Sequence, residues 1–112
     1  MERGTIVRIA LPQADGKVKV RPAVVLKKVA PFEDWLLCAI SSKLHNKVDG
    51  LDILLDATHP DFAQTRLKYT SLIRVGQLFT MPDSRIEGKI GTVSNVLYRQ
   101  IIDNLVRFIQ KQ

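Results

Sequence analysis

Short strand-like segments fill most of this chain, and helical periodicity is confined to its end. The segments are rich in Val, Ile and Leu and are bounded by Pro, Gly, Asp or other polar residues, which is typical of β-strands separated by turns. Many short strands followed by a single helix predict a mostly β fold, a small and partly open β-barrel with a C-terminal α-helix. The predicted strands are residues 5–11, 17–27, 35–41, 51–55, 71–81 and 85–93.

The C-terminal helix is predicted from its cap and its periodicity. Ser94 is a suitable N-cap, and residues 60–63 predict one further helical turn earlier in the chain. The apolar residues of this helix recur every three or four positions and form a stripe along one face. This stripe is wide enough to be a packing face against the core, and we prefer this interpretation to a surface for a partner. Its apolar residues are Leu97, Ile101, Ile102, Leu105, Val106, Phe108 and Ile109.

The second predicted strand alternates between apolar and basic residues, so its two faces should differ. Pro22 interrupts this strand and has no N–H to donate, which predicts a bulge or a sheet edge near that point. The third segment, residues 35–41, is apolar on both faces and should be buried. The second strand has an apolar face with Val18, Val20, Val24 and Leu26, and a cationic face with Lys17, Lys19 and Arg21.

The charge balance favours a polyanionic partner. Seventeen Lys and Arg residues against 11 Asp and Glu give a net charge of +6 and a pI of about 9.8. Such a surplus on a small domain suits nucleic acid, an anionic membrane surface or an acidic protein. By itself, the charge is equally compatible with a cationic surface that has no specific role.

Cysteine and histidine usage excludes several kinds of site. Cys38 is the single cysteine, so no intramolecular disulfide can form, and its apolar surroundings indicate a core residue. His45 and His59 are far apart and lack metal-ligand spacing. We therefore expect no metal site and no cofactor. No signal region or membrane-spanning run is visible, which predicts a soluble, cytoplasmic protein.

Three blocks of the sequence resemble the MazF/PemK toxins of type II toxin–antitoxin systems. They are similar to the blocks of that family in kind, order and spacing, and together they cover nearly the whole chain. An Arg-Pro-aliphatic strand, a strand ending in a hydroxyl residue and an Arg-x-x-Gln strand form a specific combination. The blocks are residues 2–7 with 15–19 and 21–26, residues 38–43, and residues 71–80 with 89–92.

The resemblance implies one toxin domain over residues 1–112, folded as an SH3-like β-barrel that forms a homodimer. It also implies a sequence-selective endoribonuclease (an mRNA interferase) that acts on single-stranded RNA, and a cognate antitoxin. Because the surface carries +6, we expect this antitoxin to be acidic. Cleavage by the substrate's own 2′-hydroxyl needs no metal and leaves a 2′,3′-cyclic phosphate.

Two residues are candidates for catalysis. Arg21 stays protonated and can hold two phosphate oxygens in a fork, and the resemblance implies that the arginine of the Arg-Pro pair is catalytic. Ser41 ends the third strand, and its hydroxyl can donate to the phosphate or orient the 2′-hydroxyl. The family usually has threonine there. A strand-end hydrogen bond is the structural alternative for Ser41, as a solvated strand face is for Arg21.

Five further residues are candidates for RNA binding. Arg74 lies in an otherwise apolar strand, so it is either paired within the fold or directed to the site. Gln77 completes the Arg-x-x-Gln motif, and Ser42 is a weaker candidate on the other face from Ser41. Lys17 and Lys19 share the strand face of Arg21 and can follow the RNA backbone.

The general base is not assigned by these residues. One branch of the family places an aspartate just before the glutamine, and this chain has Gly76 there. Thr5 likewise replaces the acidic residue that is usual after the first glycine. His45 is a possible proton carrier. The carboxylates available elsewhere are Glu2, Glu33 and Asp83.

Two other functions stay open at this point. The same barrel can bind RNA without cleaving it, an alternative that the missing aspartate allows. It can also poison DNA gyrase, as the related CcdB toxins do, although residues 106–112 show no convincing match to the C-terminal residues on which that action depends.

Overall fold

The computed structural model describes residues 1–12 and 14–111. It contains six strands, two α-helices and two short 3-10 helices among these residues. The predicted strands are all present, and their ends differ from the prediction by at most two residues. The elements are β1 (Thr5–Pro12), β2 (Val18–Val29), β3 (Asp34–Ser41), η1 (Leu44–Asn46), β4 (Ile53–Leu55), α1 (Phe62–Thr65), β5 (Ser71–Pro82), η2 (Asp83–Arg85), β6 (Ile86–Thr92) and α2 (Asn95–Gln110).

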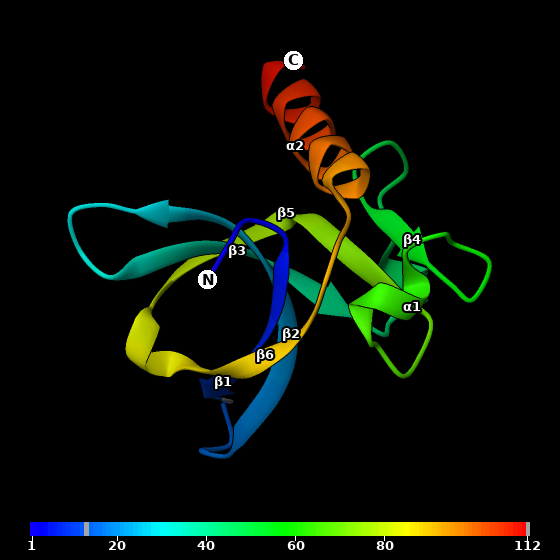
Figure 1. Cartoon of the computed structure of the whole chain (residues 1–112). Coiled ribbons are helices and arrows are strands. Elements are labelled where there is room, and N and C mark those ends of the chain that lie inside the picture. Colours follow the sequence, from blue (N-terminus) through cyan, green and yellow to red (C-terminus); the bar gives the residue numbers. More distant parts are fainter. Residues whose placement is uncertain (13, 112) are drawn as a thin grey trace.

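The strands form one curved antiparallel sheet with the order β4-β5-β3-β2-β1-β6. The strands at the two ends of this order, β4 and β6, are not paired with each other in the described part of the chain, so the sheet is not closed (Figure 1). The predicted fold class, a mostly β domain with a C-terminal helix, is confirmed.

Both faces of the sheet carry apolar clusters, because neighbouring residues on a strand point to opposite sides. Val24 and Cys38 lie on the face that α2 covers, with Leu97 and Ile101 of the helix packed against them. Val25 and Leu37 lie in a second cluster on the opposite face. This two-sided burial explains why the third predicted strand is apolar on both faces, and it confirms that Cys38 is a core residue.

The β1–β2 hairpin differs from the prediction at its tip. Val18 and Val20 were expected on a buried apolar face with Val24 and Leu26, but they are 65% and 47% exposed. The reason is the register: β3 pairs with β2 only from Ala23 onward, while β1 follows β2 down to Val18. The hairpin therefore extends beyond the rest of the sheet, and nothing in the described structure covers its tip.

The helix α2 begins as predicted. The Ser94 side chain accepts a hydrogen bond of 3.1 Å from the Leu97 N–H, which caps the first turn. In the middle of the helix, the Asn104 amide is buried and donates to the Leu51 carbonyl at 3.1 Å.

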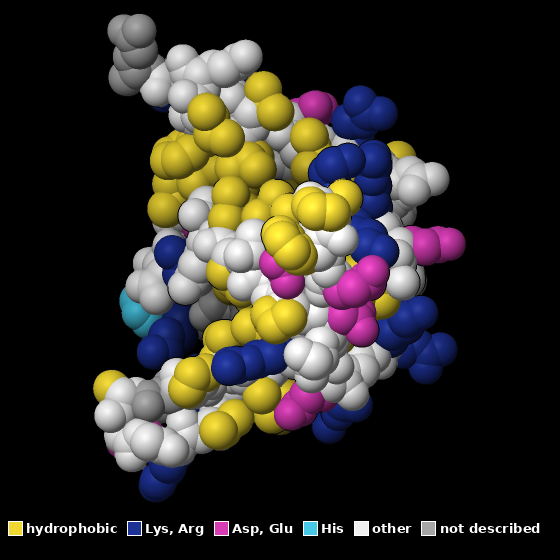
Figure 2. Space-filling view, turned by 90° about the vertical axis from the view of Figure 1, so that its left-hand side faces the viewer, with side chains coloured by type: hydrophobic (Ala, Val, Ile, Leu, Met, Phe, Trp, Pro, Cys, Tyr) yellow, Lys and Arg dark blue, Asp and Glu magenta, His cyan; other side chains and the backbone are white. Residues whose placement is uncertain are grey.

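The far end of α2 contradicts the prediction of a continuous packing face. Val106, Phe108 and Ile109 are exposed, because the last turns of the helix project past the sheet (Figure 1). Figure 2 shows hydrophobic side chains gathered near this end of the helix. No helix in the described residues is both long and apolar enough to span a membrane.

The short helix α1 is held tightly against β6. A side chain at Gly91 would collide with the backbone carbonyls of Gln64 and Thr65, so only glycine permits this approach. The Asp61 carboxylate also accepts a 2.6 Å hydrogen bond from the Ser94 N–H. These contacts fix where the chain leaves α1 and passes into the segment 66–70.

Candidate active site

The candidate site is a pocket of about 240 Å³ on the sheet, which we call the Arg21 pocket. It brings together residues from β1, β2, β3 and β5 and from the segment that follows β3. Three of these side chains are cationic, and none of the lining residues is Asp, Glu or His. Its polar lining residues are Arg21, Ser41, Lys43, Asn46, Arg74 and Gln77.

Arg21 reaches the pocket because of the local edge at Pro22. Pro22 pairs with Arg8 on β1, whereas the pairing of β2 with β3 starts one residue later, at Ala23. The predicted sheet edge near Pro22 is thus confirmed, while the bulge of β2 lies further along, between Val25 and Lys27. The β2–β3 ladder thus ends at Ala23 although β3 continues to Ser41, and the half-buried Arg21 side chain lines the pocket beyond the end of this ladder.

Ser41 has the structural role that the sequence offered as an alternative, and it also lies in the pocket. Its Oγ accepts a 3.1 Å hydrogen bond from the Lys43 N–H, which is the structural role of a serine at a strand end. Ser41 also lines the Arg21 pocket, and in this arrangement its hydroxyl can still donate a proton to a bound group. Ser42 is exposed and lines a second pocket on the other side of Ser41.

Arg74 and Gln77 face the pocket because β5 is irregular between them. In the β3–β5 register Cys38 is opposite Leu78, but the next residue, Ala39, is opposite Arg74. Residues 75–77 are extra residues in β5, and such a bulge redirects side chains out of the ladder. The exposed Gln77 and the partly buried Arg74 consequently both line the pocket.

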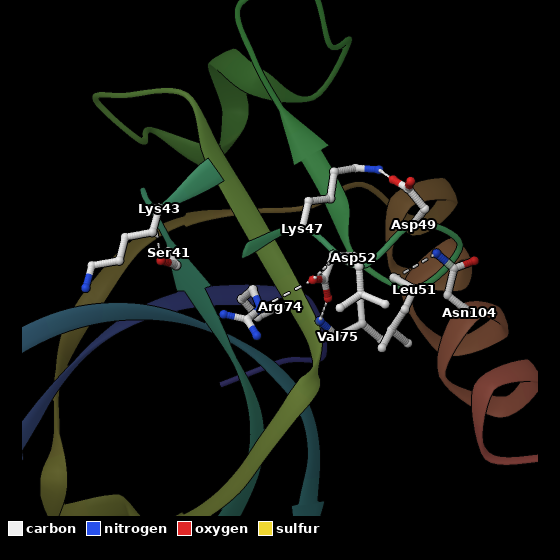
Figure 3. Close-up of polar contacts among 10 residues, drawn as sticks. Ser41, Lys43, Lys47, Asp49, Leu51, Asp52, Arg74, Val75 and Asn104 are labelled. Atoms are coloured by element: carbon white, nitrogen blue, oxygen red, sulfur yellow. Dashed lines mark hydrogen bonds and ion pairs between the residues drawn. The ribbon is translucent and has the colours of Figure 1, made fainter. Parts of the chain in front are cut away.

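Arg74 is also paired within the fold, which is one of the two alternatives for this residue, and it lines the pocket at the same time. Its Nε lies 3.3 Å from Oδ2 of Asp52, whose side chain is almost fully buried. The same carboxylate accepts hydrogen bonds of 3.0 Å from the N–H groups of Val48 and Val75 (Figure 3). The position of Arg74 is therefore set by a carboxylate that is itself anchored to two backbone groups.

Asp52, Lys43 and Asn46 were not among the site residues predicted from the sequence. Asp52 had one local signal, its position inside an otherwise aliphatic run that continues as β4. Lys43 and Asn46 are ordinary polar residues of the segment after β3, and nothing in their spacing distinguishes them from a solvated loop.

Lys17 and Lys19 lie outside the Arg21 pocket. Both are exposed near the tip of the β1–β2 hairpin. Lys19 is opposite Leu11, and Leu11 lines the pocket, so the hairpin leads from the lysines to the site.

None of the possible proton acceptors from the sequence lines the Arg21 pocket. Glu33 pairs with Lys28 at 3.4 Å, and Asp83 accepts a 3.0 Å hydrogen bond from the Trp35 indole. Glu2 lines a different depression. His45 is exposed on η1, next to Asn46, which does line the pocket.

Gly76 has a packing reason to be glycine. A Cβ at this position would lie 2.9 Å from Cδ2 of Leu51, a buried side chain. An aspartate here would need Leu51 to move. The atom approached is the end of a flexible side chain, so this contact disfavours a larger residue at position 76 without excluding it.

The remaining reactive side chain, Cys38, is unsuited to nucleophilic chemistry. Burial raises the pKa of its thiol from 9.0 to about 12, and the nearby Asp52 charge acts in the same direction. The thiolate is therefore scarce at neutral pH. No group of three or more His, Cys, Asp or Glu residues that could hold a metal ion occurs within residues 1–12 and 14–111.

Comparisons with known proteins agree with this architecture. A family model described as PemK-like, MazF-like toxin of type II toxin–antitoxin system matches residues 2–109. A comparison with curated protein sequences gives no match.

Three solved structures share the fold at low sequence identity. A mycobacterial endoribonuclease in complex with its cognate antitoxin is 12% identical, with 100% of this chain and 97% of that chain covered and a TM-score of 0.73. The Mycobacterium tuberculosis toxin MazF-mt6 is 16% identical, with coverages of 95% and 97% and a TM-score of 0.68. A MazE–MazF structure from Deinococcus radiodurans is 14% identical, with coverages of 100% and 97% and a TM-score of 0.74.

Proposed function

The chain belongs to the PemK-like, MazF-like toxin family of type II toxin–antitoxin systems, and from this premise we propose that it is a metal-independent endoribonuclease that cleaves single-stranded RNA. Residues 1–112 act as one toxin domain in this proposal. The observation that carries it is the convergence of Arg21, Ser41, Arg74 and Gln77 in one cationic pocket.

The proposed reaction uses the 2′-hydroxyl of the substrate as the nucleophile. A bond forms between this oxygen and phosphorus while the bond from phosphorus to the 5′-oxygen breaks. The 2′-hydroxyl loses its proton, and the leaving 5′-oxygen gains one. The products are a 2′,3′-cyclic phosphate and a 5′-hydroxyl, so atoms and charge balance without a metal.

Arg21 and Ser41 are the proposed catalytic residues. Arg21 can donate two hydrogen bonds to the phosphoryl oxygens, where negative charge accumulates in the transition state. Ser41 donates one more from the next strand. Both line the same pocket, so a single phosphate can be in contact with both.

The cationic character of the Arg21 pocket also helps to remove the proton of the 2′-hydroxyl. Arg21, Lys43 and Arg74 place positive charge around the reacting group. Nearby positive charges favour the ionised form of a hydroxyl and so lower the pKa of the 2′-hydroxyl. In a pocket lined by no carboxylate, catalysis rests mainly on this charge stabilisation.

We also propose a homodimer and a cognate acidic antitoxin. Two of the structurally similar proteins are complexes of a toxin with its antitoxin. The net charge of +6 suits an acidic partner, and the exposed Val106, Phe108 and Ile109 offer apolar surface for association with another polypeptide. Sedimentation at micromolar concentration should give a mass of about twice 12.6 kDa; a single species at 12.6 kDa counts against the dimer.

Purified protein incubated with a long, weakly structured RNA and excess EDTA tests the function. Site-specific fragments that end in a 2′,3′-cyclic phosphate, and their loss in Arg21→Ala, are the expected result. A mobility shift without cleavage instead identifies the non-cleaving RNA-binding module that the carboxylate-free pocket also suits. DNA breaks that depend on gyrase identify the third alternative.

A further inference from the structure

A second pocket lies on the other side of Arg21 and Ser41, and we call it the Tyr69 pocket. Its volume is about 600 Å³, more than twice that of the Arg21 pocket. The two pockets share Arg21, Pro22, Ile40 and Ser41 as a common wall. A chain bound across this wall would occupy both pockets.

The Tyr69 pocket is strongly cationic. None of its lining residues is Asp or Glu, whereas five of them are Arg or Lys. Two of these lie on β1 and β6, the two strands that follow β2 in the order of the sheet, and two come from the segment after α1. The four cations besides Arg21 are Arg8, Arg66, Lys68 and Lys89.

The segment that carries Tyr69 is tied down at both ends. At its start, the Leu67 N–H donates to the Thr65 hydroxyl at 3.3 Å. At its end, the Ser71 hydroxyl donates to the Tyr69 carbonyl at 2.8 Å. The contact of α1 with Gly91 holds the preceding turn in place. The segment is therefore positioned by contacts that do not involve its own exposed side chains.

Tyr69 is the unusual member of this lining. Its side chain is 73% exposed, although burying an aromatic ring is strongly favourable. An exposed ring between cations is the arrangement by which proteins hold single-stranded nucleic acid, since the ring stacks on a base and the cations pair with phosphates.

We propose that the Tyr69 pocket binds the nucleotide next to the scissile phosphate, with its base stacked on Tyr69 and its backbone phosphate paired with Lys68 and Lys89. This inference rests on the proposed function, because it takes the Arg21–Ser41 wall as the reaction centre. Tyr69 holds a base of any sequence, since every base has a stacking face. The pocket therefore sets substrate position and affinity, while Arg21 acts on the bond.

An acidic peptide is the competing ligand for a cationic pocket. The continuity with the Arg21 wall and the exposed ring favour RNA, because a carboxylate peptide pairs with cations but gains little from stacking. The two ligands consequently differ in how strongly their binding depends on Tyr69.

Binding of a 2′-O-methyl oligonucleotide of about nine residues tests the stacking, because it lacks the nucleophile and cannot be cleaved. Tyr69→Ala should weaken binding by about 5- to 150-fold, the range for loss of one base–aromatic stack. Tyr69→Phe should restore it, because the ring is retained. Phe32→Ala is the matched control, since Phe32 is 71% exposed on the distant β2–β3 hairpin. An abasic oligonucleotide of the same length should bind wild type and Tyr69→Ala equally.

The phosphate contacts are tested by salt dependence. Lys68→Ala should reduce the slope of log K against log salt by about 0.7, the value for one lost contact to a single strand. Arg107→Ala removes the same charge from the last turn of α2 and should leave the slope unchanged.

Cleavage of the long, weakly structured RNA, measured in parallel with oligonucleotide binding, separates the proposed subsite from the proposed nuclease function. If wild type binds and cleaves while Tyr69→Ala binds normally, the subsite is wrong and the nuclease function stands. If wild type binds without cleaving and Tyr69→Ala binds weakly, the subsite stands and the nuclease function is wrong. If wild type binds no oligonucleotide, or if poly-glutamate depends on Tyr69 as strongly as the oligonucleotide does, the RNA subsite is rejected.

Discussion

Replacing Asp52 with asparagine tests how the site is held together. The substitution keeps the shape of the side chain but removes its charge. In the native structure both carboxylate oxygens accept hydrogen bonds, Oδ1 from Val75 and Oδ2 from Val48, and Oδ2 also faces Arg74 at 3.3 Å. An amide has one accepting oxygen, so its NH₂ group must point either at the Val75 N–H or at both the Val48 N–H and the Arg74 guanidinium.

The expected loss follows from burial. Removing one partner of a fully buried ion pair costs about 3–5 kcal/mol, and leaving one buried N–H without an acceptor costs about 1–3 kcal/mol. The Arg74 side chain is 25% exposed, so water can partly replace its lost partner. We therefore expect Asp52→Asn to lower the free energy of unfolding by about 2–4 kcal/mol.

Urea unfolding at pH 7 measures this loss, and Asp49→Asn is the matched control. Asp49 pairs with Lys47 at 2.9 Å but is fully exposed, so its neutralisation should leave stability unchanged. A double-mutant cycle with Arg74→Met should give a coupling energy of at least about 1 kcal/mol, since the residues are in contact. If Asp52→Asn loses no more than Asp49→Asn, or if the cycle is additive, Asp52 does not anchor Arg74.

Four other predictions follow from the same structure. Arg21→Ala should slow single-turnover cleavage at saturating enzyme by about 10²-fold or more while the protein stays folded. Ser41→Ala should slow it less, because water partly replaces a hydroxyl. A wild-type rate for Arg21→Ala would indicate that the reaction centre lies nearer Arg74. Lys17→Ala and Lys19→Ala should weaken RNA binding at all sequences alike, each with a salt slope reduced by about 0.7, and a change in cleavage pattern would contradict this positioning role. Activity should persist in excess EDTA, and strict dependence on Mg²⁺ or products with a 3′-hydroxyl would exclude the mechanism. Between pH 9.0 and about 12 the Cys38 thiol ionises in the unfolded chain but not in the folded one, so the free energy of unfolding should fall with rising pH. The fall should be less steep in Cys38→Ala. Identical pH profiles of the two proteins would show that folding does not protect the thiol.

The alternation and the turn residues of the sequence determined the strands, because strand formation depends on local periodicity and on where Pro, Gly and Asp interrupt it. The same local chemistry identified the Ser94 cap and the burial of Cys38. Arg21 became a catalytic candidate through the family resemblance of its Arg-Pro pair, and Ser41 through its place at the end of a buried strand; the structure shows that both line one pocket.

The tertiary structure alone decided which residues that are distant in the sequence come into contact. Arg74 finds its counter-charge 22 positions earlier in the chain, and a bulge in β5 turns it toward the pocket; neither fact has a local signature. Tyr69 became notable only once the approach of α1 to Gly91 placed its segment beside Arg21.

The exposed end of α2 is another feature that the sequence could not predict. The apolar periodicity of the helix continues to Ile109. Burial of these residues, however, depends on where the sheet ends, and α2 is longer than the surface beneath it. Periodicity indicates which face of a helix is apolar, whereas the length of its partner determines how much of that face is covered.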